Sequence, residues 1–81
     1  MAVVTVRAFG ALRELVGDHQ EVDVEHVAAL LARLTEQHGP EFARRMERTT
    51  VVVGEEPTDH GDTAPLREGA EVVLLPPFAG G

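Results

Sequence analysis

The residues best placed to do chemistry in this 81-residue sequence are the last two, Gly80 and Gly81. A glycine pair at a chain end presents an α-carboxylate that no side chain hinders, and it fits a tunnel that a Cβ atom would block. Pro76 and Pro77 stand shortly before the pair, and each proline holds φ near an extended value and lacks an N–H. We therefore predict that the Gly81 carboxylate is the reactive group of this protein.

The other nucleophiles found in enzymes are largely missing from the chain. There is no Cys, Ser or Lys, so only acidic residues and a few threonines remain of the usual set. A Ser or Cys catalytic triad is excluded, and we expect no autonomous enzymatic activity. The absence of cysteine also excludes disulfides and thiol chemistry, which fits a reducing compartment. We expect a cytoplasmic protein.

Neither the histidines nor the acidic residues have the spacing of a metal site. The histidines are scattered singly, without an i, i+4 pair or a neighbouring ligand cluster, so we predict no metal site. They are His19, His26, His38 and His60. A group of acids lacks the glycine and the spacing of a calcium loop, and it is interpreted as a solvated loop. These acids are Glu55, Glu56, Asp59 and Asp62.

Three arginines gather in one short segment, at Arg44, Arg45 and Arg48. Such a cluster could bind phosphate. Because Glu41 and Glu47 stand within one helical turn of these arginines, we favour a helix face of mixed charge.

The net charge of −7 disfavours nucleic acid and anionic membranes as partners. It favours a partner protein with a basic face, although a surface that only keeps a small domain soluble explains the same charge. No apolar run approaches the length of about 20 residues that a membrane span needs, and no signal-peptide pattern opens the chain.

Four segments have the pattern of β-strands. Residues Val3–Phe9 alternate between two faces, and Gln20–Val24 follows closely enough to form an antiparallel pair with them. Thr50–Val53 is β-branched throughout, and Val72–Leu75 is a continuous apolar run. The polar stretch Thr58–Ala64 is expected to be a loop, with at most a very short edge strand, after a turn over residues 54–57.

The helical pattern is strongest over Val27–Gln37, where Val27, Leu30, Leu31 and Leu34 form one apolar stripe. We expect Asp23 or Glu25 to lead into this helix and Gly39 to end it. A shorter helix is predicted over Glu41–Glu47, with Phe42 and Met46 on its inner face. A single helical turn is expected over Ala11–Val16, and Leu66 is expected to anchor the chain before a turn at Gly69.

These elements predict one α+β domain over residues 1–81, with a flexible tail over residues 76–81. The sheet should be mixed and four- to five-stranded, with the main helix packed on one face. The last strand is apolar on both faces and should lie in the middle of the sheet. Because no second layer is available to cover its outer face, we predict that Val73 and Leu75, with Pro76 and Pro77, contact a partner protein.

Both ends of the chain resemble one known family, the MoaD/ThiS-like sulfur carriers. The first resemblance lies in Phe9-Gly10-Ala11-Leu12-Arg13-Glu14-Leu15-Val16-Gly17 after the opening strand. The second runs from Pro65-Leu66-Arg67-Glu68-Gly69 to the terminal Pro76-Pro77-Phe78-Ala79-Gly80-Gly81. The sequence departs from the family pattern at Ala70, where an acid is frequent, and at Phe78, where a smaller residue is common.

The resemblance implies a β-grasp, ubiquitin-like fold and a carrier role for the chain end. In this family Gly81 would be adenylated by an E1-like, MoeB/ThiF-like adenylyltransferase that uses ATP, with no cofactor bound by the carrier itself. A sulfur donor protein would then supply the sulfur of a C-terminal thiocarboxylate. Phe78, Ala79 and Gly80 would thread into the partner's active site.

The resemblance is greatest to the small subunit of molybdopterin synthase. The partner would then be the MoaE-like large subunit, where the tail donates sulfur to precursor Z of the molybdenum cofactor. Sulfur carriers for thiamine, cysteine or tRNA thiolation are open alternatives. A ubiquitin-like module that is conjugated to target proteins, or that only binds them, is the alternative of a different class.

Overall fold

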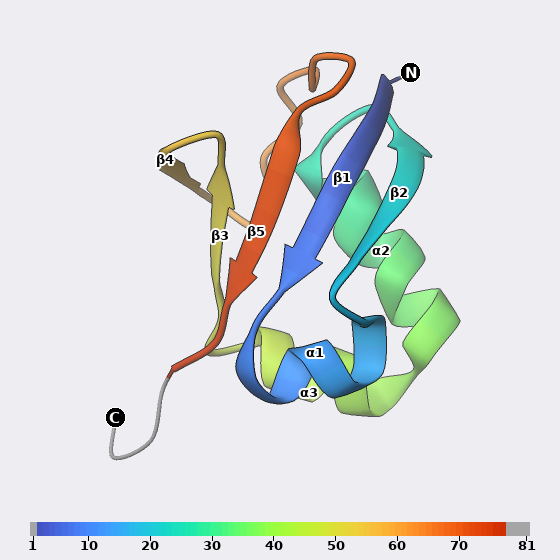
Figure 1. Ribbon diagram of the computed structural model, residues 1–81, viewed down its shortest axis with the longest axis vertical. Coiled ribbons are helices and arrows are strands. Elements are labelled where there is room, and N and C mark those ends of the chain that lie inside the picture. The colour runs from blue at the N-terminus through green and yellow to red at the C-terminus, as the bar shows by residue number, and fades with distance from the viewer. Residues whose placement is uncertain (1, 78–81) are drawn as a thin grey trace.

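Five strands and three helices follow one another in the computed structural model, which describes residues 2–77 (Figure 1). In chain order they are β1 (Ala2–Ala8), α1 (Gly10–Val16), β2 (His19–Val24), α2 (Val27–His38), α3 (Pro40–Met46), β3 (Thr50–Val53), β4 (Glu56–Thr58) and β5 (Glu71–Leu75). The expected α+β architecture is confirmed, and the sheet has the larger of the two predicted strand numbers.

The strands form one mixed sheet in the order β2-β1-β5-β3-β4. β1 pairs antiparallel with β2 and parallel with β5, while β3 pairs antiparallel with both β5 and β4. The predicted antiparallel pair at the start of the chain and the central position of the last strand are both confirmed. Because β1 and β5 are parallel, both strands end at the same edge of the sheet.

The helices cover one face of this sheet and its lower end (Figure 1). The apolar stripe of α2 is buried as predicted, with Leu30 and Leu34 fully covered. Phe42 of α3 and Val4 and Val6 of β1 are likewise inaccessible to solvent, and they belong to the same core cluster. One continuous core therefore joins the helices to the sheet.

The start of α2 differs from the expectation. Neither Asp23 nor Glu25 caps the helix, because Asp23 lies within β2 and both side chains are exposed. The N-cap is His26, whose backbone is extended and whose Nδ1 accepts a hydrogen bond of 3.0 Å from the amide of Ala29. A capping side chain has to stand directly before the first helical residue to reach the free amides of the first turn, and His26 is the residue in that position.

The edge strand β4 also lies earlier than expected. Residues 56 and 57 were predicted to be part of a turn, but Val53 pairs with Glu56 and Val52 pairs with Pro57. The chain reverses over Gly54 and Glu55 alone, with Gly54 at φ 63°. A proline is tolerated here because an edge strand has one side without ladder hydrogen bonds.

The segment before β5 is anchored as predicted. Leu66 packs against the core, and its amide donates a hydrogen bond of 2.8 Å to the carbonyl of Glu25. Gly69 has a φ of 81°, which permits the turn into β5. Within residues 2–77, none of the helices has the length and apolar character required to cross a membrane.

Candidate functional site at the base of the C-terminal tail

The sequence-predicted site residues fall into two groups. Val73, Leu75, Pro76 and Pro77 lie at the end of β5 and directly after it. The predicted reactive and threading residues lie outside the described part of the chain, and their roles stay predictions. These residues are Phe78, Ala79, Gly80 and Gly81.

Pro76 fixes the point at which the chain leaves the sheet. It is buried, whereas the following Pro77 is exposed. Pro76 lies against Gly10, where an added Cβ atom would be 3.0 Å from Pro76 Cγ. Gly10 also has a φ of 58°, which side chains other than hydrogen rarely permit. The start of α1 thus forms a seat for the base of the tail.

The sheet face turned away from the helices carries an apolar patch beside this seat. Val73 and Leu75 of β5 are half-buried on this face. Val52 of β3 is the register partner of Val73, and Phe9 follows the end of β1, with its amide donating to the carbonyl of Leu74. We call Phe9, Val52, Val73 and Leu75 the open-face patch.

A polar border adjoins the open-face patch. Arg7 is the register partner of Val73 on β1, and its guanidinium carbon lies 5.7 Å from the centroid of the Phe9 ring. The same guanidinium lies 3.6 Å from the carboxylate of Glu71. Both side chains of this ion pair are about half exposed, so the pair contributes little to stability and remains open to a partner.

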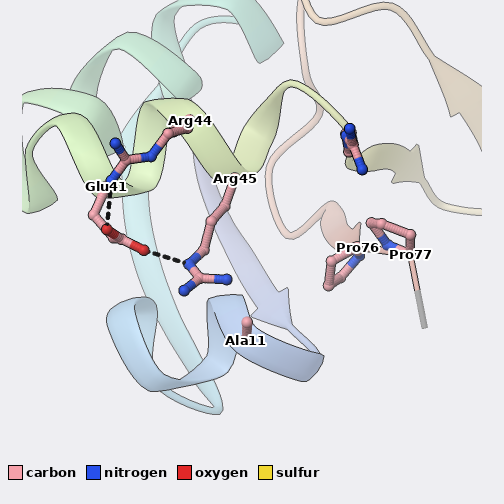
Figure 2. A pocket seen from close by; sticks show the side chains of 7 residues that line it. Ala11, Glu41, Arg44, Arg45, Pro76 and Pro77 are labelled. Atoms are coloured by element: carbon pink, nitrogen blue, oxygen red, sulfur yellow. Dashed lines mark hydrogen bonds and ion pairs between the residues drawn. The ribbon is translucent and has the colours of Figure 1, made fainter. Parts of the chain in front are cut away.

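An arginine-lined hollow lies on the other side of the tail base (Figure 2). Its volume is about 330 Å³. The hollow is formed where α3 approaches the start of α1 and the two prolines. We call it the tail-base hollow, and its lining residues are Ala11, Glu41, Arg44, Arg45, Arg48, Pro76 and Pro77.

Glu41 binds two of these arginines at once (Figure 2). Its Oε1 accepts from Arg44 Nη2 and its Oε2 accepts from Arg45 Nε, each at 2.7 Å. These hydrogen bonds, with that from Arg44 contributing most, hold the pKa of Glu41 below its ordinary value of 4.5. The expected mixed-charge helix face is therefore present for Glu41. Within residues 2–77, Glu47 forms no ion pair.

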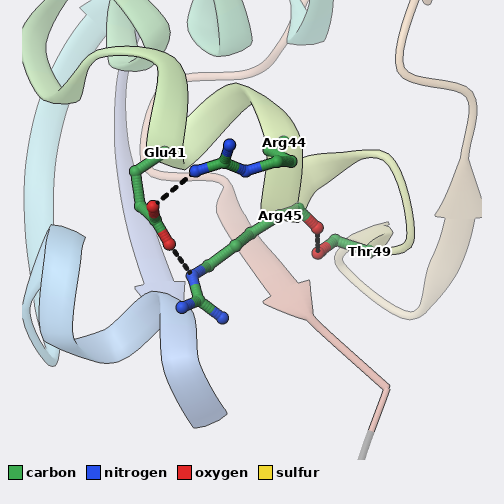
Figure 3. A network of polar contacts seen from close by, with 4 residues as sticks. All are labelled: Glu41, Arg44, Arg45 and Thr49. Atoms are coloured by element: carbon green, nitrogen blue, oxygen red, sulfur yellow. Dashed lines mark hydrogen bonds and ion pairs between the residues drawn. The ribbon is translucent and has the colours of Figure 1, made fainter.

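Thr49 fixes the end of α3 next to the hollow (Figure 3). Its hydroxyl donates to the carbonyl of Arg45 at 2.8 Å, and its amide donates to the carbonyl of Met46 at 3.0 Å. Thr49 is buried, and its own carbonyl lies 2.7 Å from Nε2 of His60. The end of α3, which carries Arg45, and the turn that carries Arg48 are thereby tied to the loop after β4.

The histidines are used singly. His26 caps α2, His60 contacts a backbone carbonyl, and the ring of His38 lies 6.0 Å from that of Phe42. Over residues 2–77 the structure contains no group of three or more His, Cys, Asp or Glu side chains that could hold a metal ion.

Two features of the site were not anticipated from the sequence. The seat formed by Gly10 for Pro76 joins residues that are far apart in the chain, and only the parallel pairing of β1 with β5 brings them together. The proximity of Arg44, Arg45 and Arg48 to the same prolines likewise depends on tertiary packing, because α3 contacts α1 and α2. The single available signal in the sequence was Gly10, the glycine that directly follows the first predicted strand.

The strand order, the helix across one face and the extended C-terminal strand at the sheet centre define a β-grasp, ubiquitin-like protein. Within that class the chain belongs to the ThiS family, whose model matches residues 6–81. The resemblance to the MoaD/ThiS-like sulfur carriers is confirmed by this match. Comparison with curated protein sequences gave no match.

Solved structures of similar shape cover nearly the whole chain. Small archaeal modifier protein 1 of Haloferax volcanii is 25% identical with a TM-score of 0.80, over 99% of this chain and 100% of that one. Its counterpart from Methanosarcina acetivorans has 24% identity and a TM-score of 0.82, over 100% and 98% of the two chains, and shows the fold alone. A structure of the complex of molybdopterin-converting factor subunits 1 and 2 from Helicobacter pylori matches with 25% identity and a TM-score of 0.72, over 98% and 99% of the chains.

Proposed function

We propose that this chain is a sulfur carrier protein, the small subunit of a two-component molybdopterin synthase in the cytoplasm. The observation that carries the proposal is the seating of Pro76 against Gly10, four residues before the Gly80-Gly81 pair, in a chain of the ThiS family. The likeness to a chain of the H. pylori complex of molybdopterin-converting factor subunits supports the choice of pathway and a MoaE-like large subunit as partner.

The proposed chemistry takes place at the Gly81 carboxylate. One carboxylate oxygen attacks the α-phosphorus of ATP on an E1-like adenylyltransferase, and pyrophosphate leaves. Hydrosulfide supplied by a donor protein then attacks the acyl carbon of the adenylate and displaces AMP, and loss of the S–H proton leaves a thiocarboxylate. In molybdopterin synthase the thiocarboxylate sulfur would bond to precursor Z, and water would cleave the acyl–sulfur bond and return the Gly81 carboxylate. In this proposal the carrier contributes no catalytic side chain. It supplies a glycine chain end whose base is held at Pro76.

The described residues supply the docking part of this function. The open-face patch gives an apolar contact that offsets the ordering entropy of a bound tail. Pro76 is buried, and in the proposed docking it would set the point from which Phe78, Ala79 and Gly80 enter a partner's tunnel. Contact of the patch with the partner and threading of the tail are part of the proposal.

A second candidate function is covalent modification of proteins, which the likeness to the small archaeal modifier protein of H. volcanii favours. Here the activated Gly81 carboxyl would form an isopeptide bond with a lysine of a target protein. The same activation step precedes both outcomes, so the fate of the activated end separates them.

The test is an intact-mass measurement after incubation with the host's E1-like enzyme, ATP and a sulfur donor. We expect a mass gain that corresponds to one oxygen replaced by sulfur, and no gain without ATP. A variant with one residue added after Gly81 should show no gain. Sulfur transfer by the untrimmed extended variant contradicts the carrier function. Isopeptide-linked conjugates without thiocarboxylate favour the modifier function.

A further inference from the structure

Two arginines of α3 and one in the turn after it form a basic patch on an acidic protein. The chain carries a net charge of −7, yet three of its seven arginines line the tail-base hollow. Against them stands the single carboxylate of Glu41, so the lining has a net charge of +2. Among residues 2–77, Arg48 has no carboxylate within ion-pair distance. A partner that is repelled by most of this surface would be attracted here.

Glu41 shows what kind of group the hollow accepts. Its two carboxylate oxygens each take one guanidinium N–H at 2.7 Å, from Arg44 and Arg45 (Figure 3). Glu41 thereby occupies donors that an external carboxylate would use, since a guanidinium fork fits carboxylates in this manner. The remaining wall is the apolar surface of Ala11 and the two prolines, which suits the methylene stem of an acidic side chain.

The position of the hollow indicates where that external group comes from. Four residues follow Pro77, and when fully extended they span about 13–14 Å. The reacting carboxyl of a threaded tail is therefore well beyond the reach of arginines that border Pro76 and Pro77. In the proposed function the phosphates of ATP react at Gly81, whereas the hollow borders Pro76 and Pro77 and would lie outside the partner's tunnel, at its rim.

We infer that the tail-base hollow binds an acidic segment of the E1-like enzyme, at the rim of the tunnel that the tail enters. Arg44, Arg45 and Arg48 would be the donors, and Glu41 would be an internal competitor for them. This inference rests on the proposed function, because a threaded tail is what brings the partner's rim to the hollow. It makes the hollow a second contact, separate from the open-face patch. Its charge interactions set the orientation in which the tail is offered.

The test compares two charge-reversed variants for binding to the host's E1-like enzyme. The first is Arg45→Glu with Arg48→Glu, and the control is Arg33→Glu with Arg67→Glu, two exposed arginines on α2 and in the loop before β5. Each pair changes the net charge by the same amount. We expect the first pair to weaken binding about tenfold or more, and the control to leave it near the parent value. Thermal melts verify that both variants remain folded.

A third variant, Glu41→Gln, tests the competitor role by a gain of affinity. Removing the internal carboxylate frees Arg44 and Arg45, so binding should tighten about two- to fivefold. The affinity of the parent protein should also fall as salt is raised, and that dependence should be weaker in the Arg45/Arg48 variant. A purely structural role of the Glu41 ion pairs predicts no gain.

Each other outcome overturns the inference in a distinguishable way. If the parent and the Arg45/Arg48 variant bind with equal affinity and the thiocarboxylate still forms, the hollow is not a binding site, while the carrier function stands. Equal losses in both reversed variants assign the effect to net charge. A loss of adenylation rate without a loss of affinity assigns the arginines to ATP phosphates. Self-association that the same reversal abolishes assigns the hollow to a second copy of this chain. A parent protein that neither binds nor is adenylated overturns both proposals.

Discussion

Gly10 meets two requirements that no other described glycine combines. Its φ of 58° lies in the left-handed region, and an added Cβ atom would be 3.0 Å from Pro76 Cγ. Gly54 has nearly the same backbone, at φ 63°, but an added Cβ there would meet nothing within 4 Å. The two positions thus separate backbone strain from contact with the tail base.

Replacing Gly10 by alanine should therefore impair both stability and function. We expect Gly10→Ala and Gly54→Ala each to lose about 1–2 kcal/mol of unfolding free energy from the left-handed backbone. Only Gly10→Ala should also slow adenylation by the E1-like enzyme, because only there does the new methyl group displace Pro76. Urea denaturation and initial adenylation rates measure the two effects. Equal adenylation rates in the two variants would show that the seat does not direct the tail.

The carboxyl group of Glu41 should titrate at a lower pH than that of an ordinary glutamate. Its hydrogen bonds from Arg44 and Arg45 favour the ionised form, so the pKa of the folded state lies below 4.5. Any stability that these contacts give is present in full above 4.5 and is lost as the pH falls through the lowered pKa. A carboxyl ¹³C NMR titration should give a midpoint below 4.5 for Glu41. In Arg44→Gln with Arg45→Gln the midpoint should rise towards 4.5, and an unchanged midpoint contradicts this cause.

At the scale of the elements, α2 depends on an unusual cap. His26→Ala removes the acceptor for the Ala29 amide and should cost about 1 kcal/mol of unfolding free energy. His26→Asp should retain most of that stability, because aspartate is a preferred N-cap. His19→Ala, at the exposed start of β2, is the control and should have little effect. Urea denaturation measures all three, and a cost as large for His19→Ala would refute the capping role.

The sequence allowed the elements to be predicted wherever apolar spacing alone decides them. The stripe of α2, the alternation of β1 and the continuous apolar run of β5 correspond to helices and strands with nearly the predicted bounds. His26 was not expected as the N-cap because histidine is not among the preferred capping residues, whereas the nearby Asp23 is of a preferred type. The edge strand β4 was expected only after residue 57, because a proline such as Pro57 is unusual within a strand. Its pairing with β3 is a tertiary contact that overrides this local preference.

Only those parts of the candidate site whose residues are neighbours in the sequence could be predicted from it. A reactive chain end and a partner-facing role of β5 were predicted from local composition, and both stay predictions. The structure places Val73 and Leu75 half-buried on the open face. The seat for Pro76 and the tail-base hollow depend on which distant segments meet at the end of the sheet. The seat depends on the parallel pairing of β1 with β5, and the hollow also depends on the packing of α3 against α1 and α2. No short stretch of sequence encodes either contact.

At the scale of the whole molecule, a single core supports every surface described above. Phe42 is fully buried where α3 meets the rest of the core, so Phe42→Ala should cost about 3–5 kcal/mol. A small domain has only about 5–15 kcal/mol in total, so a large share of the stability would be lost in one cooperative transition. Val3→Thr, on the exposed side of β1, should stay within about 0.5 kcal/mol. Separate melting of helices and sheet in Phe42→Ala, followed by circular dichroism and amide exchange, would show that the core is divided.

The parallel pairing of β1 with β5 also determines how the molecule resists a mechanical load. Because the two strands run in the same direction, Ala2 and Leu75 lie at opposite ends of the sheet (Figure 1). A pull that separates these ends slides the two strands past each other, so their hydrogen bonds share the force and have to break together. A pull across the strands would instead break the bonds one after another. A partner that pulls on the end of β5 while the start of β1 is held therefore loads the hydrogen bonds between β1 and β5 in shear.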